Sequence, residues 1–186
     1  MDTHALSAAL ASSGISLVGV AETVTTCPPA VVGLATSCGP EDGRVDEIIQ
    51  YGSPDPLRDV NDAWIRLASR FGLFGKEREF LLGVRADEES DSVWARVRLG
   101  ENWNVAGHSP STITGPCRPW TGGLLTMSLS GSVVIIGTTY EQCMAVLALP
   151  DPHRVPVIRR YAQYVMGKGK LSEWEGENLR AWLDQG

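Results

Sequence analysis

The residues with the clearest potential for catalysis are one serine and two later residues that could support it. Ser109 lies in the motif GHSPS at positions 107–111, and Asp151 and His153 follow further along the chain. A serine becomes a nucleophile when a histidine accepts its proton and a carboxylate orients that histidine. His108, next to the serine, is a second candidate base. These residue types therefore allow a serine hydrolase.

The GHSPS motif resembles the nucleophile elbow of the α/β-hydrolases, in which a serine lies on a sharp strand-to-helix turn between two glycines. The resemblance implies Ser109 as nucleophile, Asp151 as acid and His153 as base, in the chain order of that family. It covers five residues, and Ser111 replaces the second glycine. Asp151 and His153 are also closer in sequence than the family's spacing. A polar turn, with side chains bonded to nearby backbone, is the simpler interpretation of the motif.

Cysteine is the other candidate nucleophile. Cys27 and Cys117 lie in predicted loops, and His108 or His153 could serve as the base, although no spacing brings a histidine to either cysteine. The chain has three histidines and neither a CxxC nor an HxxxH pair. It also lacks a glycine-rich phosphate-binding motif. We therefore predict no metal site and no cofactor.

Acidic residues are concentrated in the segment 41–62, which has seven carboxylates and only two arginines. A local excess of negative charge attracts basic surfaces, although solvation of loops is the simpler explanation of such residues. The formal net charge of the whole chain is −6, which argues against nucleic-acid binding because phosphates require clustered lysine and arginine. We expect contacts to a partner protein from Asp46, Glu47, Asp55 and Asp59.

Trp94 is the aromatic candidate for the same contact surface. The strand predicted at 92–99 alternates in polarity, and Trp94 belongs to the same series as Arg96 and Arg98. An exposed tryptophan beside arginines is suited to protein contacts. Packing of the tryptophan beneath the loop at 107–123 is the simpler interpretation.

The elements that must position these residues centre on an antiparallel meander. Two β-prone runs, 124–129 and 132–136, are joined by a Ser-Gly turn signal, and the apolar run 143–149 predicts a third strand. Pairing the first two runs through this turn places Met127 beside Val134. The alternate residues of both runs are also largely apolar. The sequence therefore predicts a central hairpin that is buried on both faces.

The remaining elements surround this meander. Proline and glycine predict an irregular passage at 23–43, with at most a short strand at 31–35. Periodicity and capping residues predict further strands at 15–21, 45–51, 80–84, 92–99 and 102–106 and helices at 4–13, 60–71, 153–166 and 172–184. The expected fold is one α+β domain, 1–186. Its sheet is mainly antiparallel, with five to seven strands and the central meander at 124–149, and is covered on one face by the helices 60–71, 153–166 and 172–184.

Charge, size and the absence of a complete catalytic motif favour a non-enzymatic protein that binds another protein. In size, charge and class the chain is similar to bacterial immunity proteins, and that resemblance implies a basic partner. A small hydrolase using Ser109 or a loop cysteine, and a structural subunit of a homo-oligomer, are the alternatives. We expect no targeting or membrane segment, a cytoplasmic location, and a monomer or small homo-oligomer. The excess of arginine over lysine is typical of GC-rich bacterial genomes.

Overall fold

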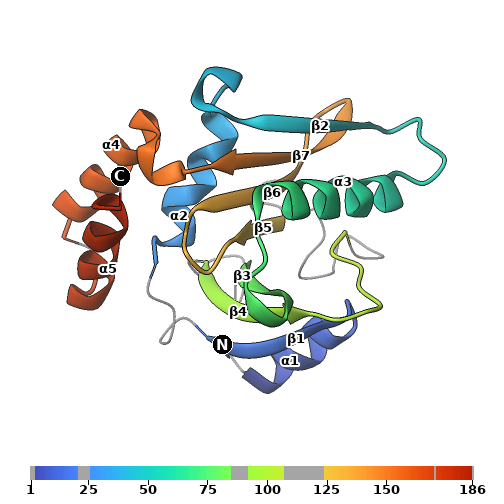
Figure 1. Cartoon of the computed structure of the whole chain (residues 1–186), viewed down its shortest axis with the longest axis horizontal. Helices are drawn as coiled ribbons and strands as arrows, with labels where there is room; N and C mark the ends of the chain where they lie inside the picture. Colours follow the sequence, from blue (N-terminus) through green and yellow to red (C-terminus); the bar gives the residue numbers. More distant parts are fainter. Residues whose placement is uncertain (1–2, 21–25, 85–91, 107–123, 170, 186) are drawn as a thin grey trace.

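The computed structural model describes residues 3–20, 26–84, 92–106, 124–169 and 171–185 of the chain. Seven strands form one sheet in the order β1-β4-β3-β5-β6-β7-β2, and all of its pairings are antiparallel (Figure 1). This architecture confirms the predicted α+β fold. The strands are β1 (Ile15–Val20), β2 (Val45–Gln50), β3 (Glu79–Val84), β4 (Val93–Leu99), β5 (Leu124–Met127), β6 (Val133–Thr139) and β7 (Cys143–Pro150).

Five α-helices flank the sheet in the described part of the chain. None of them is long and apolar enough to cross a membrane. Short 3-10 helices occur at Gly33–Ser37, Pro40–Asp42, Lys76–Arg78 and Pro152–Arg154. The α-helices are α1 (Thr3–Ala11), α2 (Pro29–Val32), α3 (Pro56–Phe71), α4 (Pro156–Gly167) and α5 (Glu173–Leu183).

The strands β5, β6 and β7 form the predicted meander with the predicted register. Met127 pairs with Val134 across β5 and β6, as expected from the turn between the two strands. The Ser128 N–H donates to the Val133 carbonyl at 2.9 Å and so continues the ladder to the turn. Gly131, in the turn, has a φ of 75°, a left-handed conformation that glycine adopts without strain.

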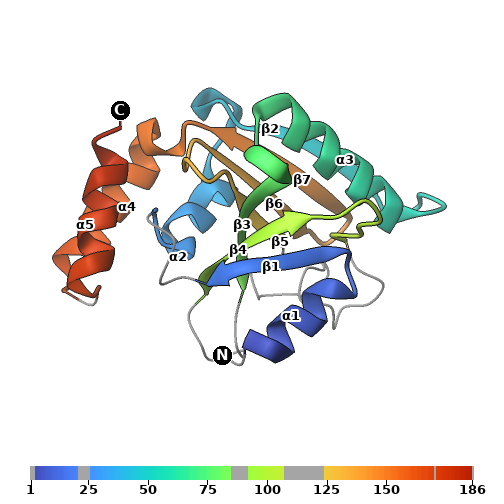
Figure 2. The same ribbon diagram turned by 60° about the horizontal axis from the view of Figure 1, so that its bottom comes forward.

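The two faces of the sheet carry separate hydrophobic clusters. Ile135 faces a cluster that also contains residues of α1 and α3, whereas Val134 faces one that contains residues of α2, α4 and α5. Helices therefore lie on both sides of the strands (Figure 2). The expectation that the three long helices cover one face is wrong, because both faces of the central strands are apolar and each requires a cover.

The helix expected at 60–71 begins one turn earlier than predicted. Asp55 is the N-cap residue, and its side chain accepts the Arg58 N–H at 3.1 Å. Pro56 occupies the first helical turn, where a proline lacks no hydrogen bond that the helix could make. Gly72 ends the helix with a φ of 74°.

Two segments differ from their predicted conformation. The short strand expected at 31–35 is helical instead, because Pro29 starts α2 and the following apolar residues pack under the sheet. The segment 102–106 is not a strand. Its N–H groups bond elsewhere, since Asn104 donates to the Ser13 carbonyl and Ala106 to the Asn61 side chain, both at 3.0 Å.

Candidate functional site

The two edges of the sheet, β1 and β2, differ in regularity. The pairing of β1 with β4 shifts register between Leu17 and Gly19, so Val18 forms a bulge. The pairing of β2 with β7 runs without interruption from Val45 to Gln50. Bulges twist an edge away from further strands. Among the described residues, β2 is therefore the regular edge, and no described strand pairs with its outer side.

The outer side of β2 presents backbone groups of Asp46 and Ile48. The Tyr140 N–H donates to the Cys143 carbonyl at 2.8 Å, so odd-numbered residues of β7 bond toward β6. The even-numbered residues of β7 then bond toward β2, and the register pairs them with odd-numbered residues such as Glu47. The N–H and C=O groups of Asp46 and Ile48 therefore point away from β7.

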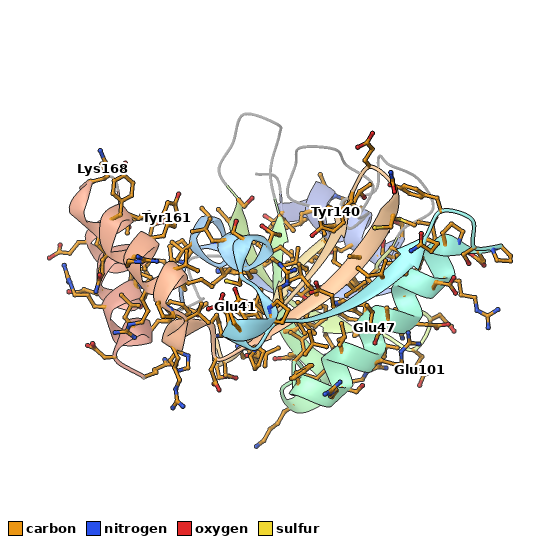
Figure 3. The ribbon with its side chains drawn as sticks, turned by 90° about the horizontal axis from the view of Figure 1, so that it is seen from above. Glu41, Glu47, Glu101, Tyr140, Tyr161 and Lys168 are labelled. Carbon is orange, nitrogen blue, oxygen red and sulfur yellow. The ribbon has the colours of Figure 1, made fainter. Side chains whose placement is uncertain are left out.

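Apolar and aromatic side chains are exposed along the same edge. The exposed fractions are 52% for Ile48, 46% for Tyr51 and 44% for Tyr140. The Tyr51 hydroxyl donates to the Tyr140 carbonyl at 2.8 Å, which joins the end of β2 to the β6–β7 turn. Figure 3 shows β2 crossing the front of the molecule, with Tyr140 near one end. Large apolar groups that gather on a surface are typical of contact sites.

Two of the predicted contact residues, Asp46 and Glu47, flank this edge on opposite faces of the sheet. Consecutive strand residues point to opposite sides. The Asp46 carboxylate forms an ion pair with Arg44 at 2.8 Å. The Glu47 carboxylate forms one with Arg66 of α3, on the other side of β2 (Figure 3). The acidic residues thus border the edge from both faces and do not form one flat patch.

The other two predicted carboxylates have local structural roles. Asp55 caps α3, and Asp59 accepts a hydrogen bond from the Ser53 hydroxyl, which fixes the turn before the helix. Both roles stabilise the connection from β2 to α3. The sequence places all four carboxylates in one segment, but the structure brings only Asp46 and Glu47 to the regular edge.

Trp94 is buried, which corrects its prediction as a surface contact. Its side chain belongs to the cluster under α2, α4 and α5, with 3% of the residue exposed. The indole N–H donates to the Cys27 carbonyl at 2.6 Å. The predicted alternation of β4 is confirmed, but the segment around Cys27 covers the face at Trp94 and leaves Arg96 and Arg98 half exposed.

These two arginines are neutralised within the sheet. Glu79 on β3 accepts hydrogen bonds from Arg96 at 2.6 and 3.0 Å and from Arg98 at 2.8 Å. Arg98 also pairs with Glu77. The hydrogen bonds from Arg98 and then Arg96 hold the pKa of Glu79 below its ordinary value. The arginines beside Trp94 therefore support the β3–β4 pair and are not a basic contact patch.

The described residues of the hydrolase hypothesis do not form a catalytic pair. His153 is 4% exposed, lies edge-on against Trp182 at 6.0 Å between ring centroids, and neither ring nitrogen has a hydrogen-bond partner in the described part of the chain. Asp151 donates its backbone N–H to the Ser132 carbonyl at 2.7 Å. The third residue of the hypothesis, Ser109, lies outside the described residues, as does the alternative base His108.

The cysteine hypothesis gains no support at Cys27. This residue is fully buried, and burial raises the pKa of its thiol well above the ordinary value, whereas a nucleophile needs the thiolate. Cys117 lies outside the described residues. Within the described ranges, no group of three metal-binding side chains occurs.

The burial of His153 is expected to make the free energy of unfolding depend on pH. Burial, with smaller contributions from Arg154 and Arg159, lowers the pKa of His153, while Asp151 opposes this effect. The unfolded chain therefore binds a proton that the folded chain does not, and stability falls as the pH drops below about 6.5. We expect urea unfolding to show a smaller loss between pH 7 and pH 5 for His153→Leu than for the unchanged protein. Equal losses would contradict this role for His153.

Sequence reasoning missed the exposed edge because its main signal, the alternation in 45–51, does not identify edge strands. Ile48 lies in the polar series of β2, between Asp46 and Gln50. One apolar residue in a polar series was the available signal.

Comparisons of the chain with protein-family models, curated proteins and solved structures found no match.

Proposed function

We propose that this chain is a non-catalytic binding domain that recognises a basic partner protein through the acidic segment 41–62. The observation that carries the proposal is the β2 edge, where Ile48 is exposed beside the carboxylates of Asp46 and Glu47. Apolar contact supplies binding energy, and the surrounding charge supplies attraction and selectivity. The proposal includes inhibitors of the immunity type and places the protein in the cytoplasm of a bacterial cell.

The charge balance of the segment supports a basic partner even though several carboxylates are paired. Arg44 and Arg66 each neutralise one carboxylate beside β2, and Arg58 lies near Asp62 at 3.9 Å. The segment 41–62 has seven carboxylates in all, and four of them lie outside these three ion pairs. A surface with such an excess attracts basic proteins and repels acidic ones, and salt weakens both effects.

The test compares two variants with equal formal charge change. Asp46→Asn with Glu47→Gln removes both carboxylates beside the edge and frees two arginines, whereas Glu173→Gln with Glu177→Gln changes exposed residues of α5. The tagged protein is used to capture partners from native cell lysate at low and high salt, and the captured protein is then purified and titrated. We expect one basic partner, released by salt, whose affinity falls about tenfold for the β2 variant and less than twofold for the α5 variant.

Two results would contradict the proposed function. One is a partner whose affinity responds equally to both variants, because that response would reflect total charge and not the β2 segment. The other is recovery of the chain alone, with a mass in solution larger than one copy, which would favour the structural-subunit alternative.

A further inference from the structure

We propose that the partner binds by adding an extended basic segment to β2 as an eighth strand of the sheet. This inference rests on the proposed function and specifies its mode of recognition. Strand addition uses main-chain hydrogen bonds for affinity and alternate side chains for specificity. The site consists of the outer side of β2 and the exposed side chains of Ile48 and Tyr51.

The backbone of β2 has the geometry that strand addition requires. Asp46 and Ile48 direct N–H and C=O groups away from β7, as the hydrogen-bond alternation of β7 shows. The six residues of β2 stay in register with β7, so the outer groups keep a regular spacing. The bulge at Val18 disrupts the same spacing at the opposite edge, in β1. The inference therefore applies to β2 alone.

The side chains of β2 define the chemistry of the added strand. Asp46 and Ile48 lie on one face, and Glu47 lies on the other. A residue opposite Ile48 meets an exposed apolar side chain, and residues opposite Asp46 or Glu47 meet a carboxylate. A segment in which basic and β-prone apolar residues alternate fits best in the register that sets an apolar residue opposite Ile48 and a basic residue opposite Glu47.

Charge selects a basic segment over a second copy of β2. Two copies of this chain each have a formal net charge of −6. Pairing β2 with its own copy would place Asp46 and Glu47 of both chains along one short ladder. Like charges in neighbouring strands destabilise the pairing. A basic strand forms the same backbone hydrogen bonds without this repulsion between carboxylates.

Proline at position 48 separates backbone recognition from side-chain recognition. The Ile48 N–H points outward, so Ile48→Pro removes no bond to β7, and edge strands tolerate proline at such positions. The matched control is Ile48→Thr, which also removes the isoleucine but keeps the N–H and suits a strand. Circular dichroism and urea unfolding of both variants establish that the fold is retained.

The probe is a synthetic nine-residue peptide in which lysine alternates with valine, compared with a peptide in which glutamate replaces lysine. We expect the lysine peptide to bind the unchanged protein, with affinity reduced by salt, and the glutamate peptide not to bind. We expect Ile48→Pro to weaken binding at least tenfold and Ile48→Thr less than threefold. In the unchanged protein, the saturating peptide should slow amide exchange of Asp46 and Ile48 at least tenfold, with little change at Glu47, which is already bonded to β7.

The outcomes separate this inference from the proposed function. Equal binding to Ile48→Pro and Ile48→Thr, or unchanged amide exchange at Asp46 and Ile48, would overturn strand addition while acidic-surface binding stands. Failure of the lysine peptide to bind the unchanged protein would overturn a basic strand as the occupant. The proposed function fails on its own two tests, which are an equal response of the partner's affinity to both carboxylate variants and recovery of the chain alone. The exchange measurement uses the unchanged protein, so it decides the matter even if Ile48→Pro does not fold.

Discussion

Replacing Trp64 with alanine is expected to lower the free energy of unfolding by about 3–5 kcal/mol. Trp64 is fully buried, and its ring lies 5.7 Å from Phe74, 5.7 Å from Phe80 and 5.5 Å from Trp103, between centroids. The indole N–H also donates to the Thr126 hydroxyl at 3.3 Å. The substitution leaves a cavity where α3 meets the sheet. Urea unfolding followed by circular dichroism measures the loss.

Trp174→Ala is the matched control, because it removes the same side chain from the surface. Trp174 lies in the first turn of α5 and is 41% exposed. Its replacement is expected to change the free energy of unfolding by only about 0.5 kcal/mol. Similar losses for both variants would contradict a central role of Trp64 in the cluster beneath α3.

Gly14→Ala is expected to destabilise the fold by about 2–5 kcal/mol, through two separate effects. Gly14 has a φ of 67°, and an alanine in this left-handed region costs about 1–2 kcal/mol. A Cβ atom would also lie 1.9 Å from the Asn102 carbonyl oxygen, which belongs to the backbone and cannot rotate away. Separating the two groups requires a shift of the chain, at a cost of about 1–3 kcal/mol.

Gly72→Ala isolates the first of these effects. Gly72 has a similar φ of 74°, but nothing lies within 4 Å of the Cβ that an alanine would add. We expect a loss of about 1–2 kcal/mol for this variant, measured by the same urea unfolding. Equal losses for Gly14→Ala and Gly72→Ala would show that the contact with Asn102 relaxes without cost.

The parts of the fold that could be predicted are those fixed by local chemistry. The Ser-Gly turn determined the pairing of Met127 with Val134, because the register of a hairpin follows from its turn. The spacing of Ser172 and Glu175 is typical of a capping box, and both hydrogen bonds of that box are present at the start of α5. Such features depend on residues close in sequence, so a single chain reveals them.

The features that could not be predicted depend on which distant segment covers which surface. Trp94 and Arg96 belong to one series of β4, yet only the Trp94 end is covered, by a segment 67 residues away that supplies the Cys27 carbonyl. The position of β2 at the edge of the described sheet likewise follows from the order of all seven strands. Polarity patterns indicate on which face of the sheet a residue lies. They do not show how far another segment covers that face, or which strand lies at an edge.

The burial of both faces of the meander has a consequence for folding fidelity. In a sheet with one solvent-exposed face, a slip of one residue would bury polar side chains, and the free-energy cost of burying them disfavours misaligned strands. In β6 the neighbours Val134 and Ile135 are both fully buried. A slip of one residue therefore exchanges one apolar side chain for another, and the misaligned pairing carries little penalty from buried polar groups. Correct alignment therefore depends on the shape of the two cores and on the tight turn at Gly131, because the geometry of that turn fixes the register of β5 against β6.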